Sequence, residues 1–263
     1  MENNHLNVNL QGAVLSLQLN RPDSLNAFSP EMIEGLLTEI QSADSNPDIR
    51  AIILSGAGRS FSAGGDVKTM GEAKSSETYE HIGKLNELVL AMRALEKPII
   101  AVVHGFAAGA AFNLALASDI ILAAEDSKFI MSFSQVGLIS DGGGLYFLPR
   151  LIGPYRAKEL FFNAQPITAE TAHEWGIVNH LYPLEKLEQE AFGFAEKLAN
   201  GPAKALGLLK KITDQSATVG LAEILEQERI TQAMMVTTDD HLEGVSAFKE
   251  KRKPIFNVKQ RVL

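Results

Sequence analysis

Short apolar runs separated by amphipathic stretches are the feature that most constrains how this chain can fold. Residues 49–54 and 99–103 are rich in branched apolar side chains, and each run is followed by glycine, which is typical of buried strands. Between them, apolar residues recur at helical spacing before Pro98: Ile82, Leu85, Leu88, Met92 and Leu95. The alternation of strands and helices predicts an α/β core.

The N-terminal part continues this alternation. Residues 14–20 alternate polar and apolar side chains, which predicts a half-buried strand with three leucines on one face: Leu15, Leu17 and Leu19. Ser29 offers an oxygen to cap a helix and Pro30 fits the first helical position, so a helix is expected from there to about Asn46.

After residue 109 the small side chains of residues 110–117 indicate a tightly packed helix, and strands are expected at 120–123 and 129–131. From Gly143 onward the pattern is predominantly helical, with segments expected near 143–151, 155–163, 168–174, 184–199, 202–214 and 218–235. The expected division is therefore an α/β core over residues 1–195 and a helical C-terminal region over residues 196–263.

Composition excludes several classes of protein. The net charge of −8 argues against a broad surface for nucleic acid or anionic membranes, and the apolar runs fall short of the roughly 20 residues that cross a bilayer. The chain has no cysteine, which removes disulfides, thiolate metal sites and cysteine nucleophiles. No spacing of His, Asp and Glu suggests a metal site. We expect a soluble, cytoplasmic protein without a secretory signal.

Three glycine-rich segments follow strand-like runs, at residues 61–66, 104–110 and 140–144. Taken singly, each is explained by a tight turn. Their order, however, coincides with other matching stretches: Arg21-Pro22 with Leu25-Asn26-Ala27, residues 105–113, residues 137–144, and Phe248 with Lys251-Arg252-Lys253-Pro254. Together these stretches resemble the enoyl-CoA hydratase/isomerase (crotonase) family over nearly the whole chain.

The resemblance implies a crotonase-like spiral of ββα units. It also implies C-terminal helices that mediate contacts between subunits or cover the active site, in a homotrimer or a dimer of trimers. The substrate would be an acyl-CoA, with coenzyme A as part of the substrate and no permanently bound cofactor. Neither nucleic acid nor a membrane is expected as a partner.

Members of this family stabilise a thioester enolate with a pair of backbone N–H groups, and the resemblance assigns these to Ser62 and Ala110. Removal of a proton beside a thioester carbonyl places negative charge on its oxygen, and fixed donors stabilise that charge. Ala110 suits this role because it begins the expected helix, where the first N–H groups lack internal partners.

The resemblance places Arg21, Leu25 and Ala27 at the nucleotide and pantetheine end of coenzyme A. Ala63, Gly64 and Asp66 accompany them, with Lys68 and, from a neighbouring subunit, Lys251 as further contacts. The alternative for Asp66 is a role in a turn or at a helix start. The alternative for the basic run around Lys251 is a solvated tail.

The acid–base residues distinguish two branches of the family. Hydratases use a pair of glutamates, whose positions match Asn113 and Phe133 here, and neither of these side chains titrates. A carboxylate stands instead at Asp141, as in the isomerase branch typified by the ring-opening isomerase of phenylacetate degradation. We therefore expect Asp141 to act as acid and base in shifting a double bond, with Asn113 orienting the substrate or a water.

Other interpretations stay open on the sequence alone. Asp141 precedes a glycine run and a helix, where it could serve as an N-cap. The alternative function is an enoyl-CoA hydratase that adds water to a 2-enoyl-CoA, and the non-enzymatic one is an acyl-CoA-binding scaffold that has lost its catalytic glutamates.

Overall fold

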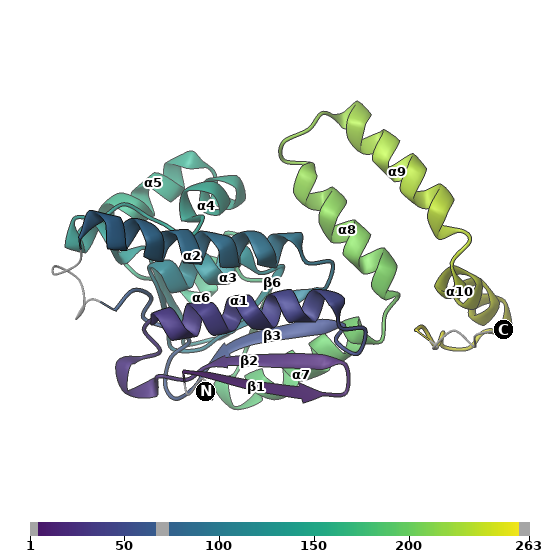
Figure 1. The fold of residues 1–263 in the computed structure, drawn as a ribbon, viewed down its shortest axis with the longest axis horizontal. Helices are drawn as coiled ribbons and strands as arrows, with labels where there is room; N and C mark the ends of the chain where they lie inside the picture. The colour runs from purple at the N-terminus through teal and green to yellow at the C-terminus, as the bar shows by residue number, and fades with distance from the viewer. Residues whose placement is uncertain (1–4, 67–73, 258–263) are drawn as a thin grey trace.

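The computed structural model describes residues 5–66 and 74–257 (Figure 1). Within these residues, six strands form the main sheet in the order β1-β2-β3-β4-β6-β9, and only β1 is antiparallel to its neighbour. The strands span Leu6–Gln11 (β1), Val14–Leu19 (β2), Ala51–Gly56 (β3), Ile99–Val103 (β4), Ile120–Ala124 (β6) and His180–Tyr182 (β9). The expected α/β core is thus confirmed.

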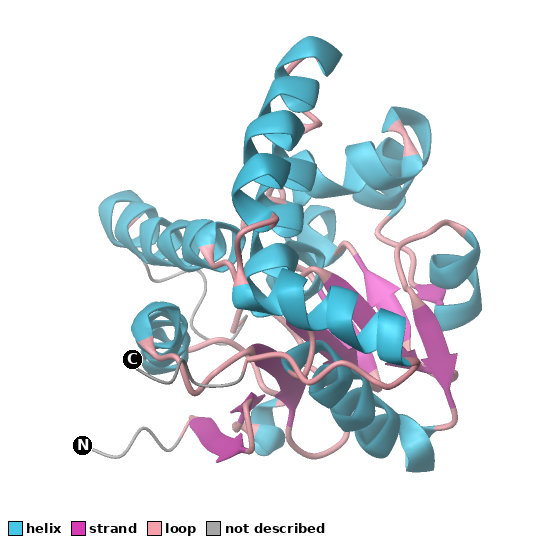
Figure 2. Cartoon of the chain, turned by 90° about the vertical axis from the view of Figure 1, so that its right-hand side faces the viewer, coloured by secondary structure: helices cyan, strands magenta, loops and turns pink. Residues whose placement is uncertain are grey.

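Helices cover both faces of this sheet (Figures 1 and 2). One face packs on α1 (Pro30–Ser45), α2 (Ser75–Ala94) and α3 (Ala110–Ala117), and Leu15, Leu17 and Leu19 lie in that core as expected. The other face packs on α7 (Leu184–Ala199). Because successive residues of a strand point to opposite faces, Ile52 enters the first core and Ile53 the second.

A small second sheet carries the segment that leads into α3. It joins β5 (Phe106–Ala108), β7 (Lys128–Ile130) and β8 (Ile167–Thr168) in the order β5-β7-β8. Beside it lie η3 (Ser132–Val136), α4 (Gly144–Ile152), α5 (Pro154–Asn163) and α6 (Ala169–Glu174). This sheet fixes where α3 begins, because β5 ends at Ala108 and α3 starts at Ala110.

The last helices form an arm that projects from the core (Figure 1). The arm consists of α8 (Ala203–Gln215), α9 (Leu221–Met235) and α10 (Asp239–Glu250). None of the residues of α9 is buried within the described chain. The division into a core and a helical region stays a prediction, and α7 continues to Ala199, past the expected boundary at residue 195.

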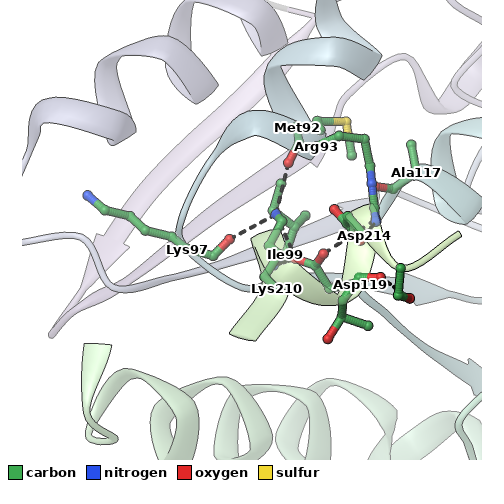
Figure 3. A network of polar contacts seen from close by, with 10 residues as sticks. Met92, Arg93, Lys97, Ile99, Ala117, Asp119, Lys210 and Asp214 are labelled. Atoms are coloured by element: carbon green, nitrogen blue, oxygen red, sulfur yellow. Dashed lines mark hydrogen bonds and ion pairs between the residues drawn. The ribbon is translucent and has the colours of Figure 1, made fainter. Parts of the chain in front are cut away.

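A network of charged side chains fastens the first helix of the arm to the core (Figure 3). The Lys210 ammonium lies 2.9 Å from the Asp119 carboxylate and donates to the carbonyl oxygens of Met92 and Lys97. Arg93 of α2 pairs with both Asp119 and Asp214. Burial lowers the pKa of Lys210 and raises the pKa of Asp214.

Several elements differ from the sequence-based expectations. The region after Gly143 is less uniformly helical than expected, because β8 and β9 lie within it and β9 completes the main sheet. The strands β1 and β5 and the helix α10 were not expected, and β3 lies two residues further along than its apolar run suggested. The other expected strands and helices are confirmed within a few residues. No helix among the described residues is long and apolar enough to span a bilayer.

Candidate active site

Residues 62–66 and the start of α3 lie side by side. The Ser62 N–H donates to the Phe106 carbonyl at 3.0 Å, and the Ala108 N–H donates to the Ser62 carbonyl at 3.1 Å. These hydrogen bonds form a parallel bridge between Ser62 and Ala107. The bridge holds two of the glycine-rich segments against each other.

The prediction that Ser62 supplies an oxyanion donor is wrong, because its N–H is already bonded to Phe106. The next N–H groups are also taken, since Ala63 donates to the Leu25 carbonyl at 2.8 Å and Gly64 to the Ser62 hydroxyl at 3.0 Å. Gly65 carries the first N–H of this segment without a partner among the described residues. The available donor is therefore three residues later than expected.

Ala110 is the first residue of α3, as expected, and its N–H has no partner among the residues described. The preceding Gly109 gives no side-chain cap, and its own N–H donates to the Ile130 carbonyl at 2.8 Å. The exposed N–H groups of a first helical turn lie at the positive end of the helix dipole. Ala110 thus presents a donor with favourable electrostatics for an anion.

The Gly65 and Ala110 donors are neighbours because Gly64 packs directly on the backbone of residues 108–110. A methyl group on Gly64 would overlap the Ala108 carbonyl oxygen and lie 3.1 Å from the Ala110 nitrogen. Gly64 also has a φ of +80°, which side-chain-bearing residues rarely adopt. Only glycine at residue 64 allows this close approach of the two segments.

Asp141 lies in the turn before α4 and is half-buried. Its Oδ1 atom is buried without a hydrogen-bond partner in the described structure. Burial raises the pKa of the Asp141 carboxyl from its ordinary value of 3.8 to about 6. The N-cap of α4 is Gly143 and receives no side-chain hydrogen bond, so the interpretation of Asp141 as a cap is wrong.

Asn113 holds the backbone of the Asp141 turn. Its side chain is fully buried in α3, and Nδ2 donates to the Ser140 hydroxyl at 2.9 Å and to the Asp141 carbonyl at 2.7 Å. Gly144 packs so closely on this amide that a methyl group at residue 144 would overlap Oδ1. The amide therefore contacts the turn that carries Asp141.

Phe133 lies beside Gly109, the residue before α3. Its ring would stand 3.7 Å from a methyl group on Gly109, and it packs against the main core. Two neighbouring apolar side chains are exposed nearby in sequence, with Leu138 50% and Ile139 80% exposed. Acid–base residues of the family were expected at the positions of Asn113, Phe133 and Asp141. Of these three side chains, only that of Asp141 can titrate.

Comparison with known proteins identifies the family and the fold. A profile described as enoyl-CoA hydratase/isomerase matches residues 9–259. The chain belongs to the enoyl-CoA hydratase/isomerase family. The 1,2-epoxyphenylacetyl-CoA isomerase of Escherichia coli (strain K12) is 38% identical over 255 residues, which cover 95% of this chain and 97% of that protein.

Other relatives in the family carry hydratase names. The 2,3-dehydroadipyl-CoA hydratase of Escherichia coli (strain K12) is 33% identical over 95% of this chain and 97% of that protein. The crystal structure of an enoyl-CoA hydratase from Polaromonas sp. JS666 matches with a TM-score of 0.93 and 32% identity, over 96% of this chain and 99% of that one. These matches confirm the crotonase-like fold and an acyl-CoA-processing enzyme.

In this enoyl-CoA hydratase/isomerase, three of the residues expected to contact coenzyme A lie in the N-terminal part of the chain, in the loop before α1. Leu25 is half-buried with a left-handed backbone, whereas Ala27 is buried. The Arg21 guanidinium donates to the Ala27 carbonyl and pairs with Asp66 at 3.2 Å, so its charge is engaged within the protein.

All the contacts expected with coenzyme A stay predictions. Ala63 and Gly64 lie in the segment beside Ala110, as described above, whereas Lys68 lies outside the described residues. Lys251 is exposed at the end of α10, and Figure 1 places α10 beyond α8 and α9, away from the core. A single chain therefore does not bring Lys251 to the other site residues.

The described residues contain no candidate metal site, and Asp141 does not line the cavity beside α4. No group of three or more potential ligands that could hold a metal ion occurs in residues 5–66 and 74–257. A cavity of about 900 Å³ lies between α2, α4 and α8 and is lined by residues such as Arg93, Phe147 and Asp214. Neither Asp141 nor Ala110 lines that cavity.

Proposed function

We propose that this enzyme is an acyl-CoA isomerase in which Asp141 moves a proton and so shifts a double bond. The observation that carries the proposal is the half-buried Asp141 carboxyl, which does not cap α4, leaves its buried Oδ1 atom without a partner among the described residues and has a pKa raised to about 6. A general base works best with a pKa near the operating pH. Asn113 and Phe133 offer no second titrating group for hydration.

The reaction follows from one base and two donors. The Asp141 carboxylate takes a proton from C2 of a 3-enoyl thioester, and the C–H electrons move into an enolate whose oxygen accepts from the N–H groups of Gly65 and Ala110. Asp141 then returns the proton to C4 as the thioester carbonyl re-forms. No atom is gained or lost, and one donor of this kind can contribute about 2.7 to 4 kcal/mol to the transition state.

Asn113 supports this role by holding the turn that carries the base. Its amide donates to the carbonyl of Asp141 itself, at 2.7 Å. A buried amide that makes short hydrogen bonds to neighbouring residues restricts the backbone on which the carboxylate stands. We assign to Asn113 the orientation of Asp141, in place of the orientation of substrate or water that the sequence suggested.

The substrate class is an enoyl-CoA or a ring-derived acyl-CoA. The name of the Escherichia coli 1,2-epoxyphenylacetyl-CoA isomerase points to a ring-derived thioester, and the Trans-2-decenoyl-[acyl-carrier-protein] isomerase of Streptococcus mutans, 34% identical, points to a straight chain. Leu25, Ala27 and Ala63 would line the coenzyme A arm, with Lys251 contributed by a neighbouring subunit of a trimer.

Substitution of Asp141 tests the function. Asp141→Asn keeps the size of the side chain but cannot take a proton at neutral pH, so turnover should fall by at least about 100-fold with acyl-CoA affinity unchanged. The measurement is product analysis by mass spectrometry over a panel of 3-enoyl, 2-enoyl and ring-derived thioesters. Isomerisation leaves the mass unchanged, whereas hydration adds the mass of water.

The matched control is Asp126→Asn, which removes an exposed carboxylate from a turn and should change neither rate nor affinity. Ser140→Ala is not suitable, because the Ser140 hydroxyl accepts a hydrogen bond from Asn113. A product heavier by one water would assign the hydratase activity instead. Binding of acyl-CoA with no turnover over the panel would favour a scaffold.

A further inference from the structure

The segment that carries the Gly65 donor is held mainly by residues 21–28, from the loop before α1. The Phe28 N–H donates to the Gly64 carbonyl at 2.7 Å, and the Ser62 hydroxyl donates to the Asn26 carbonyl at 2.7 Å. With the Ala63 hydrogen bond to Leu25, these contacts fix residues 62–64 on one side. The position of the Gly65 N–H therefore depends on how this loop is built.

The loop has an unusual backbone and a fully buried anchor. Leu25 and Asn26 have φ values of 51° and 54°, a conformation that non-glycine residues adopt at a cost and that is concentrated at functional sites. The Asn26 side chain accepts from the Arg21 N–H and donates to the carbonyls of Ala57, Ser60 and Phe61, each within 3.2 Å. The loop and the segment around residue 61 are thereby one rigid unit.

The Arg21 side chain joins this loop to the residue that follows Gly65. Its Nη1 atom donates to the Ala27 carbonyl at 2.6 Å and to Asp66 Oδ2 at 3.2 Å, and Nη2 donates to the same carboxylate oxygen at 3.2 Å. Both side chains are mostly shielded, with 21% of Arg21 and 14% of Asp66 exposed. Since Asp66 directly follows Gly65, the ion pair fixes the residue next to the proposed donor.

We propose that Arg21 and Asp66 are a positioning pair that sets the direction of the Gly65 N–H in the oxyanion site. The proposal rests on the proposed function and deepens it, because it states what aligns one of the two donors. Residues 62–64 are anchored by their own hydrogen bonds, and Gly65 forms a parallel bridge with Phe28 that leaves the Gly65 N–H without a partner among the described residues. The ion pair at residue 66 adds a side-chain contact directly after Gly65.

The ion pair between Arg21 and Asp66 also makes it possible to distinguish positioning of Gly65 from binding of the coenzyme A phosphates. An approaching phosphate meets a neutralised guanidinium together with a carboxylate, so the net attraction is small. The two roles predict different results for Asp66→Asn. Loss of the negative charge would strengthen phosphate binding to Arg21, whereas loss of a positioning pair would leave affinity unchanged and slow the reaction.

The experiment measures kcat, KM and the affinity for free coenzyme A in Arg21→Gln, Arg21→Lys and Asp66→Asn. Because a displacement of about 1 Å can cost 100-fold in rate, each variant should lower kcat by at least about tenfold, with KM and coenzyme A affinity within about twofold of the parent. The double variant Arg21→Gln/Asp66→Asn should be no slower than the slower single variant, since both remove the same contact. Lys84→Gln, which breaks the exposed pair with Glu87 on α2, is the control.

A spectroscopic signal distinguishes positioning from a loss of fold. The ¹³C shift of the carbonyl in a bound, labelled thioester reports its polarisation by the donors, and the variants should move it toward its value in water while the melting temperature stays close to that of the parent. Weaker coenzyme A binding by Arg21→Gln with unchanged kcat would overturn the proposal, as would an unshifted carbonyl signal in all variants. If Arg21→Gln does not fold, Arg21→Lys and Asp66→Asn decide by the same criteria.

The experiment distinguishes failure of the isomerase assignment from failure of the positioning pair. A parent enzyme without isomerase turnover on any thioester of the panel would remove the isomerase assignment. The carbonyl shift is measured on a bound thioester without turnover, so it would still support or overturn the positioning pair in that case.

Discussion

At the scale of single residues, the pKa of Asp141 determines how the rate depends on pH. The carboxyl must be ionised to take a proton, and burial raises its pKa to about 6. We therefore expect kcat/KM to rise with pH through about 6 and to level off above it. A pH–rate profile of the isomerisation checks this, and a profile that turns near pH 4 would show that Asp141 titrates like an exposed aspartate.

The same burial makes Asp141 a cost to stability at neutral pH. The pKa of this carboxyl is 3.8 in the unfolded chain and about 6 in the folded one. The fold is therefore most stable below pH 3.8, where the carboxyl is protonated in both states, and it loses stability as the pH rises to 6 and the buried group becomes charged. Asp141→Asn removes this charge, so the variant should be more stable at pH 7. The difference in pKa between the folded and unfolded states corresponds to up to about 3 kcal/mol, because a difference of one in pKa is about 1.36 kcal/mol. Urea unfolding at pH 7 and pH 4 measures the difference, which should disappear at the lower pH.

Asn113 can be tested by a change of one atom. Asn113→Asp loses both amide donations to the turn and adds a second carboxyl near Asp141, and like charges in one site disfavour ionisation. We expect a lower maximal rate and a pH profile that turns above 6, with the two carboxyls titrating as a coupled pair. Asn46→Asp, at the half-buried C-cap of α1, keeps an oxygen that can accept from the Asp48 N–H and is the control. An unshifted profile would show that Asn113 does not act on the base.

At the scale of elements, two adjacent lysines of α8 allow a matched comparison. The Lys210 side chain is 7% exposed within the Asp119 network, whereas Lys211 is 47% exposed and pairs with Glu96 at the surface. Lys210→Met should cost about 3 kcal/mol, because one partner of a buried pair is left behind. Lys211→Met should cost less than about 1 kcal/mol.

The measurement is the free energy of unfolding, with hydrogen exchange of the α8 amides as a local probe. Faster exchange in α8 for Lys210→Met alone would confirm that the network fastens the arm. Equal losses for both variants would show that the network contributes no more than a surface pair.

The sequence predicted those elements whose own pattern determines them. The helix α1 was located from Ser29, Pro30 and its apolar stripe, and the Ser29 side chain indeed accepts from the Met32 N–H. The strand β1 was missed because it is an edge strand on which Val8 and Leu10 are each 46% exposed, so no buried face marks it. The strands β5 and β9 are three residues each, too short for a periodic signal.

The candidate site likewise has features that local sequence predicts and features that depend on distant residues. The start of α3 at Ala110 could be predicted because small residues and a preceding glycine mark it locally. The sequence could not show that the Ser62 N–H is occupied, because its partner is the carbonyl of Phe106, which is distant in sequence. The proposal of Gly65 as the donor therefore depends on the fold. Likewise, only the fold reveals that Asp141 leaves the cap of α4 empty and that Arg21 is paired with Asp66.

At the scale of the whole molecule, the arm predicts an oligomer. Several apolar side chains of α9 and α10 are exposed in the single chain: Leu221 (74%), Leu225 (53%), Ile230 (53%), Met234 (54%), Leu242 (59%) and Phe248 (86%). Such exposed apolar surface marks an interaction site. We expect light scattering to show a trimer or a hexamer, and Leu221→Glu combined with Leu225→Glu to give smaller species. A parent chain that is monomeric at micromolar concentration would contradict this prediction.

Since α9 has no buried residue in the single chain, we expect the stability of the arm to depend on protein concentration. A helix that finds its hydrophobic partner only on another chain is stabilised in proportion to the logarithm of chain concentration. Dilution should therefore lower the melting temperature and release the arm before the core unfolds, and the response of this protein to heat would depend on how much of it a cell makes.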